Sequence, residues 1–151
     1  MASWVAYQEY HLRTGALVVL KVEAYDPRDY LAGHYLIYRV DYNDTSLCTS
    51  RTGEELCVCL APQGNYHSAS WHGSCESRPG DSCELYLHGR CDWRGFNAGI
   101  ERYYISEELA SRHRTIPPHS SIHVRLDGNG GGIVSGFYVD QVPLEELPAS
   151  Q

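Results

Sequence analysis

The stretch that decides the fold runs Tyr25-Asp-Pro-Arg-Asp-Tyr-Leu-Ala-Gly-His-Tyr-Leu-Ile-Tyr-Arg-Val-Asp-Tyr42. It begins as a polar turn around Pro27 and continues, after Gly33, as an alternation of aromatic, aliphatic and polar residues. Pro and Asp favour turns, and a period of two is typical of a half-buried strand. We therefore predict a strand over residues 35–42, whose core face carries Leu36, Tyr38, Val40 and Tyr42.

Runs rich in β-branched or alternating residues predict further strands. They cover residues 17–24, 55–61, 68–74 and 83–89, and another strand follows residue 97. The clearest hairpin joins residues 121–127 to 133–140 through Gly128-Asn-Gly-Gly-Gly132. The strands therefore predict a mainly β protein: a single antiparallel sheet, barrel-like or sandwich domain.

Two helices complete this prediction. Residues 3–13 form an aromatic, amphipathic stretch that Thr14-Gly15 would end. A short helix is expected near 107–113, because Ser106 is a good N-cap and Pro117 prevents continuation. From residues alone, the N-terminal helix suits either packing on the domain or the end of a membrane helix, whose Trp and Tyr would lie at the interface.

A chain of 151 residues suits one domain with a core of its own. We expect a membrane-proximal helix or stalk at 1–15, a β domain at 16–142 and a flexible tail at 143–151. The formal net charge of −7 argues against nucleic acid or an anionic membrane surface as a partner, because both require clustered Lys and Arg.

Six cysteines lie in the middle of the chain: Cys48, Cys57, Cys59, Cys75, Cys83 and Cys91. An even number in a short chain is typical of disulfides formed in an oxidising compartment. Cys57 and Cys59 share a strand face and therefore need different partners. We favour the pairs Cys48–Cys57, Cys75–Cys83 and Cys59–Cys91, which would close two hairpin-like connections and one longer crosslink. Zinc is the alternative, but no second pair of ligands follows at the usual spacing, so we expect no metal and no cofactor.

The stretch from Val22 to Tyr35 resembles the signature of the GDYXXLXY family of bacterial membrane-anchored proteins. Leu87-His-Gly-Arg-Cys91, Gly99-Ile-Glu-Arg-Tyr-Tyr-Ile105 with Glu107, and the hairpin at 124–140 are similar too, so the resemblance covers about residues 10–141 in order. The chain departs from the signature at His34, Tyr38 and Val40, which stand for Asp, Leu and Tyr. The cysteines are not part of the family pattern.

The resemblance implies a membrane anchor just upstream of Trp4. The domain would then lie on the extracytoplasmic, periplasmic face of the inner membrane, which agrees with the cysteine argument. It also favours the stalk interpretation of residues 3–13. No activity comes with the family, and we expect an unidentified integral membrane protein as the partner.

The leading functional hypothesis is a non-catalytic binding or assembly module. Its candidate functional surface comprises Asp26, Arg28, Asp29, His34, Tyr35, Glu101 and Arg102. One alternative is a hydrolase using Lys21 with a serine, or His34 with the two aspartates, but no Ser-x-x-Lys or Gly-x-Ser-x-Gly motif accompanies Lys21. Another alternative is a Cys/His metal-binding domain built on Cys57 and Cys59.

Overall fold

The computed structural model describes residues 15–23, 31–32, 35–44, 47–49, 53–80, 83–92, 95–106, 108–109 and 118–147. The elements are β1 (Ala16–Glu23), β2 (Leu31–Ala32), β3 (Tyr35–Ile37), β4 (Arg39–Asp41), β5 (Glu55–Gln63), β6 (Tyr66–Gly73), η1 (Cys75–Ser77), β7 (Tyr86–Asp92), β8 (Gly95–Asn97), β9 (Arg102–Tyr104), β10 (Ser120–Leu126), β11 (Gly132–Val139), β12 (Val142–Pro143) and η2 (Leu144–Glu146). The two η elements are single 3-10 turns.

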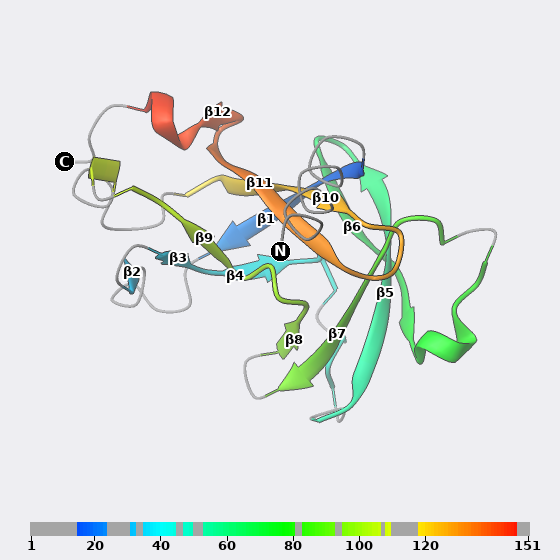
Figure 1. Ribbon diagram of the computed structural model, residues 1–151. Helices are drawn as coiled ribbons and strands as arrows, with labels where there is room; N and C mark the ends of the chain where they lie inside the picture. The colour runs from blue at the N-terminus through cyan, green and yellow to red at the C-terminus, as the bar shows by residue number, and fades with distance from the viewer. Residues whose placement is uncertain are drawn as a thin grey trace, which may run out of the picture.

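The prediction of a mainly β protein is confirmed, and the strands curl into a half-barrel (Figure 1). They form three antiparallel sheets rather than one: β12-β11-β10-β1-β4, β2-β3-β9 and β6-β5-β7-β8. The helix predicted at 3–13 lies outside the described residues. Of the helix predicted near 107–113, only residues 108 and 109 are described, both with helical backbone, so that helix stays a prediction.

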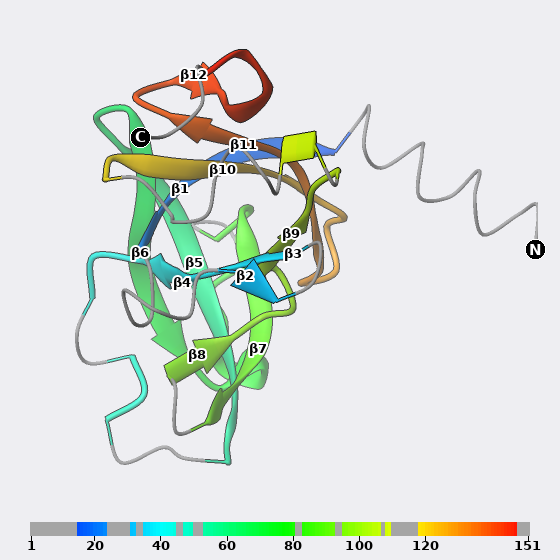
Figure 2. The same ribbon diagram turned by 90° about the vertical axis from the view of Figure 1, so that its left-hand side faces the viewer.

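The predicted hairpin is present as β10 and β11. Its turn is held by Asp127, whose carboxylate accepts the backbone N–H groups of Asn129 at 2.7 Å and Gly131 at 3.0 Å. Gly128 and Gly130 have φ angles of 84° and 92°, which side chains other than glycine rarely adopt. Figure 2 shows this hairpin lying across one end of the four-stranded sheet, where the His88 N–H donates to the Gly130 carbonyl at 2.7 Å.

Residues 35–42 of the opening stretch belong to two sheets. β3 pairs with β2 and β9, and after Tyr38 the chain continues as β4, which pairs with β1. The predicted core face is confirmed, because Leu36, Tyr38, Val40 and Tyr42 are all buried. The hydroxyl of Tyr38 donates to the carbonyl of Ile100 at 2.7 Å. Residues 35–42 therefore connect the five-stranded sheet, through β4, to the three-stranded sheet that contains β9.

All six cysteines form disulfides, as predicted, but the predicted pairing is wrong. The pairs are Cys48–Cys91, Cys57–Cys75 and Cys59–Cys83. β5 is flanked by both β6 and β7, so its two cysteines, buried on one face, meet the segment that connects those neighbours. Cys48 instead reaches the buried Cys91 of β7. Closeness in sequence was thus a poor guide, because the partners are set by the order of strands in the sheet.

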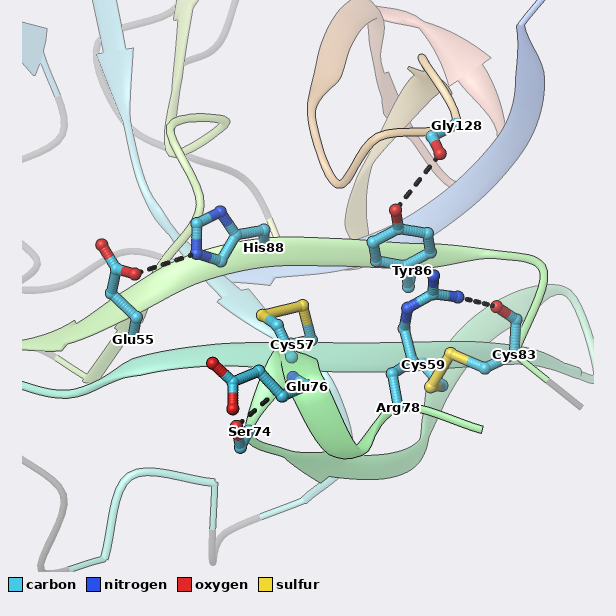
Figure 3. The surroundings of a disulfide bond; sticks show 11 residues. Glu55, Cys57, Cys59, Ser74, Glu76, Arg78, Cys83, Tyr86, His88 and Gly128 are labelled. Carbon is cyan, nitrogen blue, oxygen red and sulfur yellow. Dashed lines mark hydrogen bonds and ion pairs between the residues drawn. A yellow bond between two sulfur atoms is a disulfide. The ribbon is translucent and has the colours of Figure 1, made fainter. Parts of the chain in front are cut away.

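The crosslinked segment between β6 and β7 packs onto β7 (Figure 3). The Arg78 guanidinium lies 3.8 Å from the centre of the Tyr86 ring and donates to the carbonyl of Cys83 at 2.9 Å. The Tyr86 hydroxyl in turn donates to the Gly128 carbonyl at 3.2 Å. Two disulfides and these polar contacts therefore fix this segment between β5 and the hairpin turn.

The start of the predicted C-terminal tail is part of the fold. β12 pairs with β11, and the side chain of Leu144 is fully buried. The Tyr103 hydroxyl donates to Glu145 at 3.1 Å. Residues 142–147 thus pack against β9 and β11, whereas residues 148–151 lie outside the described part.

Candidate binding site

The structure describes only part of the predicted functional surface. Asp26, Arg28, Asp29 and His34 lie outside the described residues, so their grouping stays a prediction. Tyr35 is described for its backbone, which pairs with Tyr104 of β9. Arg102 begins β9 opposite Ile37, and Glu101 immediately precedes it. The described members therefore lie along one pair of strands, β3 and β9.

A pocket of about 430 Å³ lies beside this strand pair, and we call it the β4 pocket. Its wall includes the four successive residues from Arg39 to Tyr42. Alternate residues of a strand face opposite sides of the sheet, so a cavity that contacts all four lies along the edge of β4. The remaining lining residues are Glu23, Asp44, Leu47, Cys48, Thr49, Gly95, Phe96 and Glu101.

The pocket exists because the chain before β9 turns away from β4. The β3–β9 ladder extends to a backbone bond from the Tyr38 N–H to the Glu101 carbonyl, at 3.1 Å. Residues 98–100 then form a turn, with Gly99 at a φ of 86°, and lead back to β8. β8 supplies Gly95 and Phe96 to the opposite wall. The pocket thus fills the space that opens between β4 and β8.

The side chain of Glu101 holds this turn together. Its Oε1 accepts backbone N–H groups from Ala98 at 3.1 Å, Gly99 at 2.8 Å and Ile100 at 3.0 Å. Burial raises the pKa of the Glu101 carboxyl, and the backbone N–H bonds oppose that rise. Glu101 was a candidate functional residue from sequence. Its carboxylate has a structural role in the turn, and Glu101 also lines the pocket.

Among the described residues of the pocket wall, acidic residues outnumber basic ones. Glu23, Asp41, Asp44 and Glu101 are acidic, and Arg39 is basic. Asp44 Oδ2 lies 3.0 Å from His72 Nδ1, and Asp41 Oδ1 accepts the N–H of Asn43 at 2.8 Å.

Two aromatic rings and one unusual hydroxyl complete the wall. The rings of Tyr42 and Phe96 meet edge to face with centroids 5.5 Å apart. Tyr42 is buried, yet within the described part of the chain its hydroxyl has no hydrogen-bond partner. Burial raises the pKa of Tyr42 most, followed by the charge of Glu101. A buried hydroxyl without a hydrogen-bond partner costs stability.

The model of the family described as "GDYXXLXY protein" matches residues 1–136. The chain belongs to the GDYXXLXY family. No curated protein and no solved structure matches it.

Two stretches that resemble the GDYXXLXY family contribute residues to the wall of the β4 pocket. The signature run continues through β3 into β4, and the stretch from Gly99 to Ile105 contains the Glu101 turn and β9. The two stretches pair with each other where β3 lies beside β9, from Tyr35 opposite Tyr104 to Ile37 opposite Arg102. Their junction forms one end of the β4 pocket, so both family stretches contribute to its wall.

The disulfides of this GDYXXLXY protein indicate an oxidising, extracytoplasmic environment. They also occupy Cys57 and Cys59, which removes both sulfurs as thiolate ligands for a metal. Among the described residues, no group of three His, Cys, Asp or Glu side chains is arranged to hold a metal ion. In the same part of the chain, no helix has the length and apolarity to cross a membrane.

Lys21, the proposed base of the hydrolase alternative, is exposed on β1. Its ammonium lies 4.9 Å from the centre of the Tyr66 ring, a cation–π contact, and its backbone pairs with Asp41 and Ser121. Of the pocket residues, the functional surface predicted from sequence included only Glu101, and Asp44, Thr49 and Phe96 are among those it missed. They lie on a loop and a short edge strand, where no local pattern marks them as neighbours of β4.

Proposed function

We propose that the protein is the extracytoplasmic domain of a membrane-anchored protein and works as a non-catalytic binding or assembly module. Its partner is an integral membrane protein, and its anchor precedes the β domain and holds it at the periplasmic face of the inner membrane. The anchor and its side of the membrane are what the family resemblance implies.

The observation that carries this proposal is the β4 pocket. Its volume of about 430 Å³ lies in the range of sites that accept small molecules or single side chains. Its described lining includes acidic residues and two aromatic residues, Tyr42 and Phe96, and such residues can recognise a partner. Binding is favoured by such a wall when it is already in place before the partner arrives.

The disulfides support a pre-formed wall. Cys48 lines the pocket and is bonded to the buried Cys91 near the end of β7. The other two disulfides fix the segment between β6 and β7 to β5. A domain crosslinked in this way keeps its geometry in an oxidising compartment. A rigid recognition surface is what an assembly module requires.

Site-specific photocrosslinking in intact cells tests the proposal. A benzoylphenylalanine placed at Thr49, an exposed residue of the pocket wall, should crosslink to an integral membrane protein identified by mass spectrometry. The same probe at Asn129, exposed on the β10–β11 turn and outside the pocket, is the matched control. The proposal is wrong if Thr49 gives no membrane-protein adduct, or gives the same adducts as Asn129.

A further inference from the structure

None of the three disulfides joins two cysteines that are neighbours in chain order. Two of them interleave, and the third encloses both: the pairs are Cys57–Cys75, Cys59–Cys83 and Cys48–Cys91. Pairing in order of appearance along the chain would instead give Cys48–Cys57, Cys59–Cys75 and Cys83–Cys91. The native pairing and this chain-order pairing have no disulfide in common.

In an unfolded chain, loop length favours the wrong partner for Cys48. Cys57 is 9 residues away from it in sequence, whereas its native partner Cys91 is 43 residues away. Because the probability of closing a loop falls roughly as the 3/2 power of its length, Cys48 meets Cys57 about tenfold more often than Cys91. Cys57 also enters the oxidising compartment before Cys91, since an exported chain emerges from its N-terminus.

The strands that select the native pairs are complete only after all six cysteines have emerged. Cys91 is carried to Cys48 by β7, which pairs with β5. β7 is in turn held by the β10–β11 turn, where the His88 N–H donates to the Gly130 carbonyl. β10 begins at Ser120, well after the last cysteine. The thiols are therefore open to oxidation before the fold that orders them is present.

We infer that the chain reaches its native pairing through a thiol–disulfide isomerase of the oxidising compartment, a protein that presents a reactive thiolate to non-native disulfides. The inference concerns how the domain matures, and it does not depend on the proposed function. It follows from the connectivity of the disulfides and from the order of the strands.

Four exchanges convert the chain-order pairing into the native one. The isomerase thiolate attacks Cys48 of the Cys48–Cys57 disulfide, forms a mixed disulfide and releases the Cys57 thiolate. The Cys57 thiolate attacks Cys75 and releases Cys59, and the Cys59 thiolate then attacks Cys83 and releases Cys91. The Cys91 thiolate attacks Cys48 and expels the isomerase thiolate. Each exchange breaks one S–S bond and forms one, so no oxidant or reductant is consumed.

Burial gives the exchange its direction. In the folded domain Cys57, Cys59, Cys83 and Cys91 are all buried, and Figure 3 shows Cys57 and Cys59 enclosed between β5 and the crosslinked segment. A thiolate has to reach a sulfur atom to attack it, so the native disulfides are withdrawn from exchange once the strands have packed. Non-native pairs keep the strands apart and remain open to attack.

The test compares the disulfides formed in living cells. The full chain is exported to the periplasm of a bacterial strain that has its thiol–disulfide isomerase and of a strain that lacks it. Free thiols are alkylated at harvest, and the pairs are identified by mass spectrometry of unreduced peptides. The fraction with Cys48–Cys91 should be several-fold lower without the isomerase, with Cys48–Cys57 in its place. Equal fractions in the two strains would overturn the inference, because folding alone would then select the pairs.

A control chain separates pairing from oxidation. The variant Cys48→Ala, Cys57→Ala, Cys75→Ala, Cys91→Ala keeps only Cys59 and Cys83, which have a single possible pairing. Its fraction of crosslinked chains should be the same in both strains. An equal loss of this crosslink without the isomerase would contradict the inference, because the enzyme would then act on oxidation in general.

A second experiment tests the redox balance with purified protein. The full chain is reduced, unfolded in denaturant, oxidised with diamide to give non-native pairs, and then returned to buffer without oxygen. A catalytic amount of reduced isomerase should restore the three native disulfides while the number of free thiols in the chain stays at zero. An isomerase whose active-site cysteines are replaced by alanine should leave the pairing unchanged. Equal recovery with the active and the inactive isomerase would overturn the inference.

Discussion

The role of Glu101 leads to the sharpest stability prediction. Replacing it with alanine removes the acceptor of three backbone N–H groups, those of Ala98, Gly99 and Ile100. A hydrogen bond to a charged group contributes about 1.5–3 kcal/mol, and partial exposure of this turn lets water replace part of it. We therefore expect Glu101→Ala to lower the free energy of unfolding by about 3–4 kcal/mol.

Glu101→Gln should cost less, about 1–2 kcal/mol, because its amide oxygen can still accept these N–H groups while its amide nitrogen cannot. The assay is urea unfolding of the disulfide-bonded protein, followed by Trp fluorescence and analysed with a common slope. Glu76→Gln is the control, because Glu76 is exposed and only its backbone N–H is bonded to Ser74. A cost below about 1 kcal/mol for Glu101→Ala would refute the idea that this carboxylate holds the turn.

The same residue predicts a pH dependence. Because burial raises the pKa of Glu101 above 4.5 in the folded protein, the unfolded chain loses this proton first. Glu101 therefore makes the free energy of unfolding fall as the pH rises from 4.5 through the folded pKa, and its contribution is level above that. Glu101→Gln should lack this fall. An unchanged pH profile in the variant would show that another group is responsible.

Three further predictions concern the core, the crosslinks and a half-buried histidine. Tyr42→Phe should raise the free energy of unfolding by about 1 kcal/mol, since it removes an orphaned hydroxyl, whereas Tyr38→Phe should lower it by about 1 kcal/mol; thermal unfolding of both would contradict us if the signs agreed. Removing the Cys48–Cys91 disulfide should lower the free energy of unfolding by about 4 kcal/mol and removing Cys57–Cys75 by about 3 kcal/mol, because the first closes a loop of 43 residues and the second one of 18. Denaturant unfolding of the paired Cys→Ala variants measures both costs, and the reverse order would contradict this prediction. His67 Nδ1 accepts the Val19 N–H at 3.1 Å, and burial lowers the His67 pKa. The contribution of His67 to the free energy of unfolding should therefore be full above pH 6.5 and decline as the pH falls through the folded pKa. His67→Gln should reduce this decline, and an identical pH profile in the variant would show that His67 does not cause it.

Local patterns were sufficient to predict the longer strands, but they did not mark the short strands β2, β8 and β12. The alternation at residues 36–42 identified its own core face, because side chains on a strand alternate whatever lies beside it. The glycine-rich turn at 128–132 likewise identified the β10–β11 hairpin, because only glycine adopts those φ angles readily. Both signals are contained within a few residues of the chain.

The disulfide pairing depends on long-range order and was therefore missed. Cys57 and Cys59 were rightly expected to need different partners, but their partners follow from β5 lying between β6 and β7. No spacing between cysteines encodes that arrangement. The order of the strands in the sheet decides the disulfide pairing.

The candidate site was predicted only in part. Glu101 was named from sequence, but its place beside Asp41, Thr49 and Phe96 depends on where the chain leaves β4 for β8. The acidic turn with Asp26, Asp29 and His34 stays a prediction. The orphaned hydroxyl of Tyr42 could not be foreseen, because it arises from the packing of the whole half-barrel.

The central claim is that the wall of the β4 pocket contacts an integral membrane partner. Its most direct test is the yield of the Thr49 crosslink in intact cells, compared at equal expression between the parent protein and the double variant Glu23→Gln, Asp41→Asn, which changes two residues of the pocket wall. The account predicts a several-fold lower yield in this variant and an unchanged yield with Glu76→Gln, Glu146→Gln, which changes two exposed acids outside the pocket. Equal yields in all three proteins would contradict it.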